Sequence, residues 1–179
     1  MNEDKINKVL KWAKSELTKY IQPCSTKGCK YSRIQPGDVM CKTPNPTPDS
    51  DDIQKENCEN GHPFWNFYCM RFVRTAFNAP AEYPKAEDMY QALRQKGAIS
   101  TCQDIPLGAL VFWHWSDYGH IGIYAGDNKV IHTGTKSALK KRGIRESLLQ
   151  DITDVLDGYN RNSQTSYLGW AYPPKNWLK

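Results

Sequence analysis

The segment 119–133, GHIGIYAGDNKVIHT, constrains the fold more than any other part of the chain. It predicts a single β-hairpin with one histidine on each strand. Successive side chains of a strand point to opposite faces, so His120, Gly122 and Tyr124 share one face. The position of the second histidine depends on the length of the turn, because a shift of one residue moves every side chain to the other face.

A three-residue turn at 126–128 is the prediction that brings the histidines together. Asn128 tolerates the left-handed conformation that such a turn needs, and Lys129 then pairs with Ala125. His132 falls opposite Gly122, diagonal to the first histidine and about 7–8 Å from it. Glycine leaves room for the two imidazoles to approach. A two-residue turn is expected to place them on opposite faces.

A cysteine lies in the first turn of a predicted helix in the segment 65–74, WNFYCMRFVR. Asn66 is a suitable N-cap, and apolar residues recur at helical spacing around Cys69, namely Trp65, Phe72, Val73 and Ala76. Unpaired amides and the helix dipole favour a thiolate in the first turn, so we expect a lowered pKa for Cys69. The alternative is a buried, unreactive thiol. With a histidine nearby, the cysteine supplies the parts of a thiol nucleophile and its base, which indicates a cysteine hydrolase.

The order of these residues resembles the NlpC/P60 and CHAP superfamily of bacterial cell-wall cysteine peptidases. The matching segments are Cys69 with Phe72-Val73, GALVFW at 108–113, GHIGIYAG at 119–126 and VIH at 130–132. The Phe-Val-Arg that follows the cysteine and YLGW at 167–170 favour the CHAP-like side. The resemblance covers most of the chain and leaves about 22–61 unmatched.

What the resemblance implies is a papain-like α+β fold, with helices packed on a curved antiparallel sheet. It also implies that Cys69 is the nucleophile, His120 the base and His132 the residue that orients the base. The implied reaction is cleavage of a peptide or amide bond in peptidoglycan through a thioester acyl-enzyme. The expected partners are peptidoglycan or its peptide stems, and an inhibitor or immunity protein is a further candidate.

The residues around the nucleophile depart from the family pattern. NlpC/P60 proteins usually have Asp-Cys-Ser-Gly there, whereas this chain has Tyr-Cys-Met-Arg at 68–71. Two alternatives therefore stay open: a non-catalytic wall-binding module on the same fold, and an acyltransferase or a thiol peptidase that acts on proteins. The cysteine precedes both histidines, an order that favours a hydrolase over the circularly permuted acyltransferases of the superfamily.

Length and cysteine spacing set the domain organisation. A chain of 179 residues predicts one domain, 1–179, with a Cys/Pro-rich insertion at about 22–61. Four cysteines, Cys24, Cys29, Cys41 and Cys58, could form two disulfides, a zinc site or free thiols; the wide spacing favours disulfides. Cys102 is expected to be structural. Cys69, His114, His120 and His132 lack the short spacing of a zinc site, so we expect neither a catalytic metal nor a cofactor.

The remaining patterns concern secondary structure and localisation. Helical periodicity covers about 6–20, 85–96 and 146–156, and the strands after Gly108 predict an antiparallel sheet with the helices on one side. The net charge of +5 suits anionic partners, although no segment resembles a nucleic-acid motif. The sequence shows neither a signal peptide nor a membrane-spanning run. Localisation is therefore open, and a role on the cell wall requires export or another delivery route.

Overall fold

A computed structural model describes residues 2–17, 69–134, 143–159 and 165–179. The elements in chain order are α1 (Glu3–Glu16), α2 (Cys69–Phe77), α3 (Ala86–Gln95), β1 (Leu110–Trp113), β2 (His120–Gly126), β3 (Lys129–Gly134), β4 (Gly143–Leu148), α4 (Leu149–Asp157), β5 (Tyr167–Ala171) and the 3-10 helix η2 (Lys175–Leu178). Several predictions lie outside the described residues: the insertion at about 22–61 with its four cysteines, and the Asn66 N-cap. The single-domain organisation stays a prediction.

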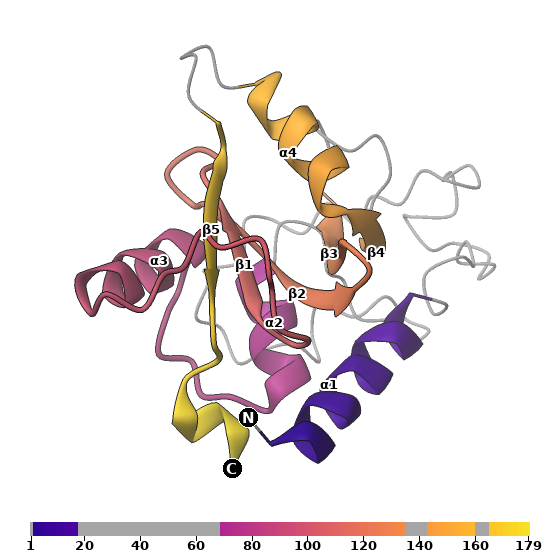
Figure 1. The fold of residues 1–179 in the computed structure, drawn as a ribbon. Helices are drawn as coiled ribbons and strands as arrows, with labels where there is room; N and C mark the ends of the chain where they lie inside the picture. Colours follow the sequence, from indigo (N-terminus) through magenta and orange to yellow (C-terminus); the bar gives the residue numbers. More distant parts are fainter. Residues whose placement is uncertain (1, 18–68, 135–142, 160–164) are drawn as a thin grey trace, which may run out of the picture.

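The described strands form one antiparallel sheet in the order β4-β3-β2-β1-β5. Strands β1 to β4 follow each other along the sheet, and β5 returns from the C-terminal part of the chain to pair with β1 (Figure 1). The predicted α+β class is confirmed. The hairpin strands β2 and β3 lie between β1 and β4, so both are hydrogen-bonded on two sides.

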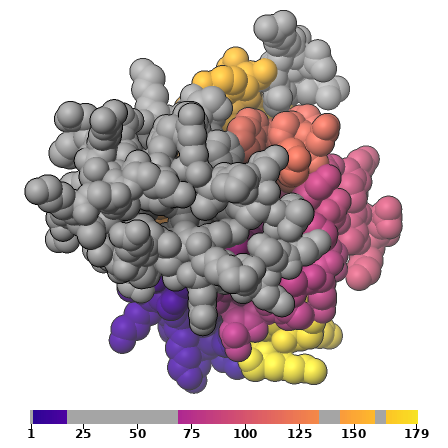
Figure 2. Space-filling model, turned by 180° about the vertical axis from the view of Figure 1, so that it is seen from behind, coloured from indigo at the N-terminus to yellow at the C-terminus, as the bar shows by residue number. Residues whose placement is uncertain are grey.

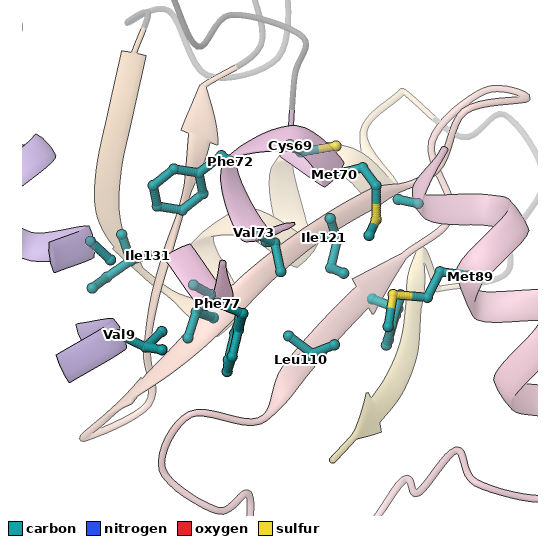
Figure 3. Close-up of a cluster of buried hydrophobic side chains, with 14 of the residues drawn as sticks. Val9, Cys69, Met70, Phe72, Val73, Phe77, Met89, Leu110, Ile121 and Ile131 are labelled. Carbon is teal, nitrogen blue, oxygen red and sulfur yellow. The ribbon is translucent and has the colours of Figure 1, made fainter. Parts of the chain in front are cut away.

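Helices α1, α2 and α3 pack against one face of the sheet. Their buried residues join the inward side chains of β1, β2 and β3 in one hydrophobic cluster, which includes Val9, Phe72, Met89, Phe112, Ile121 and Ile131. The buried stripes of α1 and α3 are those that the sequence predicts, with Ile6 and Ala13 in α1 and Met89 and Leu93 in α3. Figure 3 shows α2 lying across the strands in this cluster.

The prediction that all helices lie on one side is wrong for α4. Ile152 and Leu156 of α4 pack with Val111, Trp113 and Val130, which belong to the opposite face of the sheet. Apolar residues on the central strands point both ways, because the strands are buried on both faces. A second helical layer is therefore needed to cover them.

The predicted helix at 146–156 begins later than expected. Residues 146–148 belong to β4, where Glu146 pairs with Ile131 and Leu148 with Lys129. Helix α4 starts at Leu149, and Leu148 is 45% exposed rather than part of a buried helical stripe. Pairing with β3 satisfies the backbone of this segment and overrides its helical pattern.

The two ends of the chain lie close together. The Lys5 ammonium donates a hydrogen bond to the Lys179 carbonyl at 3.1 Å. Figures 1 and 2, seen from opposite sides, both show α1 beside the C-terminal residues. Among the described residues, no helix combines the length and the apolar character that crossing a membrane requires.

Candidate active site

The β2–β3 hairpin has the predicted register but a different turn. His132 pairs with Gly122, as predicted. The turn contains only Asp127 and Asn128, both left-handed with φ of 50° and 56°, and Gly126 pairs with Lys129. A β-bulge between Tyr124 and Gly126 adds the odd residue that the longer turn was expected to supply. The bulge, and not the turn, places both histidines on one face.

The two imidazoles are directly hydrogen-bonded. His120 Nε2 lies 3.0 Å from His132 Nδ1, and the ring planes are nearly perpendicular at 87°. Both side chains are buried, at 1% and 0% exposure. Gly122 lies beside this pair, and a Cβ atom added there would approach the His132 Cβ to 3.1 Å and press on the Val130 side chain. Glycine at position 122 therefore leaves the space in which the two imidazole rings approach each other.

A serine from β4 extends the pair to a third strand. Ser147 Oγ lies 3.1 Å from His132 Nε2. Ser147 pairs with Val130, two residues before His132, so its side chain reaches the imidazole along the sheet diagonal. Both ring nitrogens of His132 thus have partners. The remaining ring nitrogen, His120 Nδ1, is buried and has no hydrogen-bond partner among the described residues.

Aromatic rings from β1 and the following turn surround His120. The Trp113 ring lies 5.8 Å from the His120 ring, and the Trp115 ring approaches it edge-on at 6.4 Å. Trp113 is in turn fixed by its indole N–H, which donates to Thr153 Oγ1 of α4 at 3.0 Å. These contacts restrict the orientation of the imidazole and exclude water from it.

The turn before β2 is held by the start of α3. The amide of Glu87 donates to the Tyr118 carbonyl at 3.0 Å, and the amide of Gly119 donates to the Trp115 carbonyl at 3.0 Å. Gly119 has φ of +66°, and a Cβ atom there would lie 2.8 Å from the Glu87 nitrogen. Only glycine fits both the backbone conformation and this close approach. His120 therefore enters the sheet at a position fixed from both sides.

Cys69 is the first residue of α2, at the edge of the cluster that α2 forms with the sheet, near Ile121 and Val73 (Figure 3). Burial raises the pKa of its thiol to about 11. The backbone amides of Ile121, Met70 and Cys69 itself oppose this effect by hydrogen-bonding the sulfur, but they do not outweigh it. The expectation of a lowered pKa is therefore wrong, because desolvation exceeds the influence of the helix start.

The Cys69 thiol is near the histidine pair through the backbone, but no hydrogen bond joins the thiol to either imidazole among the described residues. The Ile121 amide that contacts the sulfur belongs to the residue directly after His120. Yet His120 Nδ1 has no hydrogen-bond partner among the described residues, so the thiol does not donate to it in this structure. The structure thus brings together His120 and His132 directly, and Cys69 through the neighbouring backbone.

Burial also keeps both imidazoles neutral. It lowers the pKa of His120 to about 4. The pKa of His132 is held well below its usual value, first by burial and then by the charges of His120 and Arg145, while the Thr133 carbonyl acts in the opposite direction. Arg145 pairs with His132 across β3 and β4, which explains its influence. At neutral pH the site therefore contains a thiol and two uncharged imidazoles.

The other candidate residues lie apart from this site. His114 follows β1 and is exposed, and Cys102 is an exposed free thiol before β1. Cys69 is also a free thiol. No group of three or more His, Cys, Asp or Glu side chains within the described ranges is arranged to hold a metal ion.

Comparison with known protein families shows which family the chain belongs to. The model of the NlpC/P60 family matches residues 58–156, more than half of the 179 residues. The chain belongs to the NlpC/P60 family. No curated protein matches it closely enough to add a named relative. The matched region of this NlpC/P60 protein includes Cys69, His120, His132 and Ser147, and members of the family are generally peptidases or hydrolases, which suggests a cell-wall peptidase or amidase.

Sequence reasoning missed two features of this NlpC/P60 site. Ser147 lies in a segment with a helical pattern, so nothing marked it as a partner of His132. The bulge at Ala125 carries no distinctive residue, whereas the Asp-Asn pair before Lys129 is a recognisable signal for a two-residue turn with left-handed residues. Taken together, those two residues and the need to bury both histidines could have pointed to a bulge.

Proposed function

We propose that this NlpC/P60 protein is a cysteine hydrolase that cleaves a peptide or amide bond in peptidoglycan, with Cys69 as nucleophile, His120 as base and His132 as the residue that orients the base. The observation that carries the proposal is the buried His120 Nδ1 atom, which has no hydrogen-bond partner in the part of the chain that the structure describes. Buried polar atoms are rarely left without a partner, and those that are require an explanation. A nitrogen kept free to accept the thiol proton provides one.

The proposed reaction begins from the neutral pair. As the Cys69 sulfur attacks the scissile carbonyl, the thiol proton passes to His120 Nδ1 and the carbonyl oxygen becomes an oxyanion. The imidazolium then protonates the leaving nitrogen, the C–N bond breaks and a thioester remains. Water attacks the thioester while His120 Nδ1 takes its proton. The C–S bond then breaks, His120 returns the proton to the sulfur, and the acid product leaves.

The environment supports proton transfer during the attack rather than before it. A thiol with a pKa of about 11 beside an imidazole with a pKa of about 4 does not form an ion pair in the resting enzyme. The substrate must therefore bring the two groups into contact as the S–C bond forms. Catalytic hydrogen bonds often tighten only when substrate is bound, so the missing contact in the free protein is compatible with this role.

The amide at the start of α2 suits the developing negative charge. Backbone N–H groups in the first turn of a helix have no partner within the helix, and they can donate to an oxyanion. We assign the Cys69 N–H to this role in the proposed mechanism.

A non-catalytic wall-binding module is the second candidate. The raised pKa of the Cys69 thiol and its lack of a hydrogen bond to His120 are the properties of an inert buried cysteine. In that case the histidine pair would serve only to hold three strands together. The two candidates differ in whether peptidoglycan is cut.

Digestion of purified peptidoglycan, followed by mass spectrometry of the fragments, tests the proposal. We expect the wild-type protein to release fragments and Cys69→Ala to release none, since only the nucleophile is lost. Cys102→Ala is the matched control, because Cys102 is also a free thiol but is exposed and outside the site. It should digest peptidoglycan as the wild type does.

The outcomes separate the candidates and identify the bond. Fragment masses distinguish an amidase, which separates sugar from peptide, from an endopeptidase, which shortens the peptide stems. Equal digestion by wild type and Cys69→Ala would refute the thiol mechanism. Binding to peptidoglycan by the folded wild-type protein without any digestion would establish the binding module instead.

A further inference from the structure

Ser147 is a polar side chain in contact with the proposed catalytic machinery that the mechanism above does not use. Its Oγ atom lies 3.1 Å from His132 Nε2, and His132 Nδ1 lies 3.0 Å from His120 Nε2. The three side chains come from the adjacent strands β4, β3 and β2. They form one continuous hydrogen-bonded row that ends at the free His120 Nδ1.

The position of one proton in this row determines the positions of the others. A neutral imidazole has one donor nitrogen and one acceptor nitrogen, and burial keeps both rings neutral. If Ser147 donates to His132 Nε2, then His132 Nδ1–H donates to His120 Nε2, and the proton of His120 lies on Nδ1. If Ser147 accepts from His132 Nε2–H, then His120 Nε2–H donates to His132 Nδ1, and His120 Nδ1 carries only a lone pair.

Only the second arrangement produces a base. A protonated Nδ1 cannot take the thiol proton, and it would leave a buried N–H group without an acceptor. A bare Nδ1 can accept the proton directly. Ser147 is half-buried, and its hydroxyl has acceptor lone pairs as well as one proton, so it can accept a hydrogen bond from His132 Nε2–H.

We propose that Ser147 is a positioning residue that acts through two imidazoles: by accepting a hydrogen bond from His132 Nε2–H, it holds both histidines in the Nε2–H tautomer and leaves His120 Nδ1 free as the base. This inference rests on the proposed function for its catalytic consequence. The tautomers themselves are a property of the resting protein, and they can be measured without substrate.

Two-bond ¹⁵N–¹H correlation spectra of histidine-labelled protein report the tautomer of each ring. We expect both His120 and His132 of the full-length wild-type protein to show the Nε2–H form at neutral pH, with assignments from His120→Gln and His132→Gln. In Ser147→Ala the acceptor is gone, so the His132 signals should shift toward a mixture that includes the Nδ1–H form. Ser147→Thr keeps the hydroxyl and should keep the wild-type pattern.

Kinetics on peptidoglycan fragments provide the second readout. Ser147→Ala should lower kcat by about threefold to tenfold, the effect expected for one hydrogen bond, with KM unchanged because substrate contacts are intact. Ser147→Thr should recover most of the loss. Ser166→Ala is the matched control: it removes a buried serine hydroxyl that donates to the Thr153 carbonyl at 3.3 Å, away from both imidazoles.

These experiments distinguish a failure of the Ser147 inference from a failure of the hydrolase proposal. If the wild type does not digest peptidoglycan but the tautomers change as expected in Ser147→Ala, the hydrolase proposal fails and the positioning role stands. A His132 that carries its proton on Nδ1 in the wild type overturns the inference. So do unchanged tautomers in a folded Ser147→Ala, or a loss of kcat that Ser166→Ala reproduces.

Discussion

The histidine side and the cysteine side of the site are built in different ways. His120 and His132 are fixed to each other by a 3.0 Å hydrogen bond between paired strands, and the strand register alone brings them together. Cys69 is positioned by the packing of α2 on the sheet, and backbone amides, that of Ile121 among them, hydrogen-bond its sulfur. The proposed base is therefore preorganised by local pairing, whereas the proposed nucleophile depends on tertiary packing.

Burial acts on both sides but with opposite effects on pKa. It disfavours the charged form of each group, so it raises the pKa of the thiol to about 11 and lowers that of His120 to about 4. Both groups are thus kept neutral. In the proposed mechanism, the proton therefore passes from the thiol to His120 only when a substrate joins the two sides of the site.

Measured against Cys69→Ala as the background, the largest expected effect on kcat comes from replacing the histidines. His120→Ala should lower kcat by roughly 10²–10⁴, the usual contribution of a general acid–base group. His132→Ala should lose less, on the order of tenfold to a hundredfold, since it removes the orienting partner and leaves the base. His132→Gln and His132→Asn should retain more turnover than His132→Ala, because they can still hydrogen-bond to His120.

Turnover of peptidoglycan fragments by these four variants checks the ranking. Cys69→Ala sets the background, and equal thermal unfolding midpoints would show that the comparison is not one of folding. If His132→Ala turns over substrate as fast as the wild type, His132 has only a structural role and the orienting residue lies elsewhere.

A smaller effect is expected from forcing the two rings apart without removing either. A Val side chain at position 122 would press on Val130 and on His132, whose Cβ lies 3.1 Å from the position of the added Cβ. Overpacking of this kind costs about 1–3 kcal/mol of folding stability. We expect Gly122→Val to lower kcat while the rate of Cys69 alkylation by iodoacetamide stays unchanged.

Alkylation kinetics and kcat, measured on the same folded preparation, separate the two sides of the site. A variant that loses turnover and alkylation rate together would show that the histidine pair and α2 are mechanically linked. Gly158→Ala is a suitable control for glycine replacement in general, because Gly158 has a helical φ of −61° and an added Cβ atom would make only an ordinary contact, 3.4 Å from the Val155 carbonyl oxygen.

The same contrast explains how much could be predicted from the sequence. The pairing of His132 with Gly122 followed from alternation and from the need to put both histidines on one face, so it was predictable even though the turn was not. The shift in the Cys69 pKa was not predictable, because it depends on how deeply α2 packs on the sheet. The role of Ser147 was not predictable for a related reason, because its strand β4 forms through pairing with β3.

The smallest expected effect is a near absence of change between pH 7 and pH 5. In the proposed mechanism the active form of His120 is the neutral ring, and its lowered pKa of about 4 keeps about nine-tenths of the rings neutral at pH 5. An imidazole with an ordinary pKa of about 6.5 would be about 3% neutral at that pH. We therefore expect kcat/KM to fall by less than about twofold over this range, with the acid limb centred near pH 4.

Stability should respond to pH over the range in which activity does not. The unfolded chain protonates His120 near pH 6.5 and the folded protein only near pH 4, so the unfolded state holds more protons between these values. The free energy of unfolding should therefore decrease as pH falls from about 6.5 to about 4, and urea midpoints at pH 7, 6 and 5 would measure the decrease. His120→Gln should reduce this slope, because glutamine does not titrate, and the lowered pKa of His132 should account for part of what remains. An acid limb of kcat/KM near pH 6.5, together with a flat stability profile, would instead mean that the imidazole is solvated in the working enzyme, and the neutral-pair mechanism would have to be abandoned for a preformed thiolate.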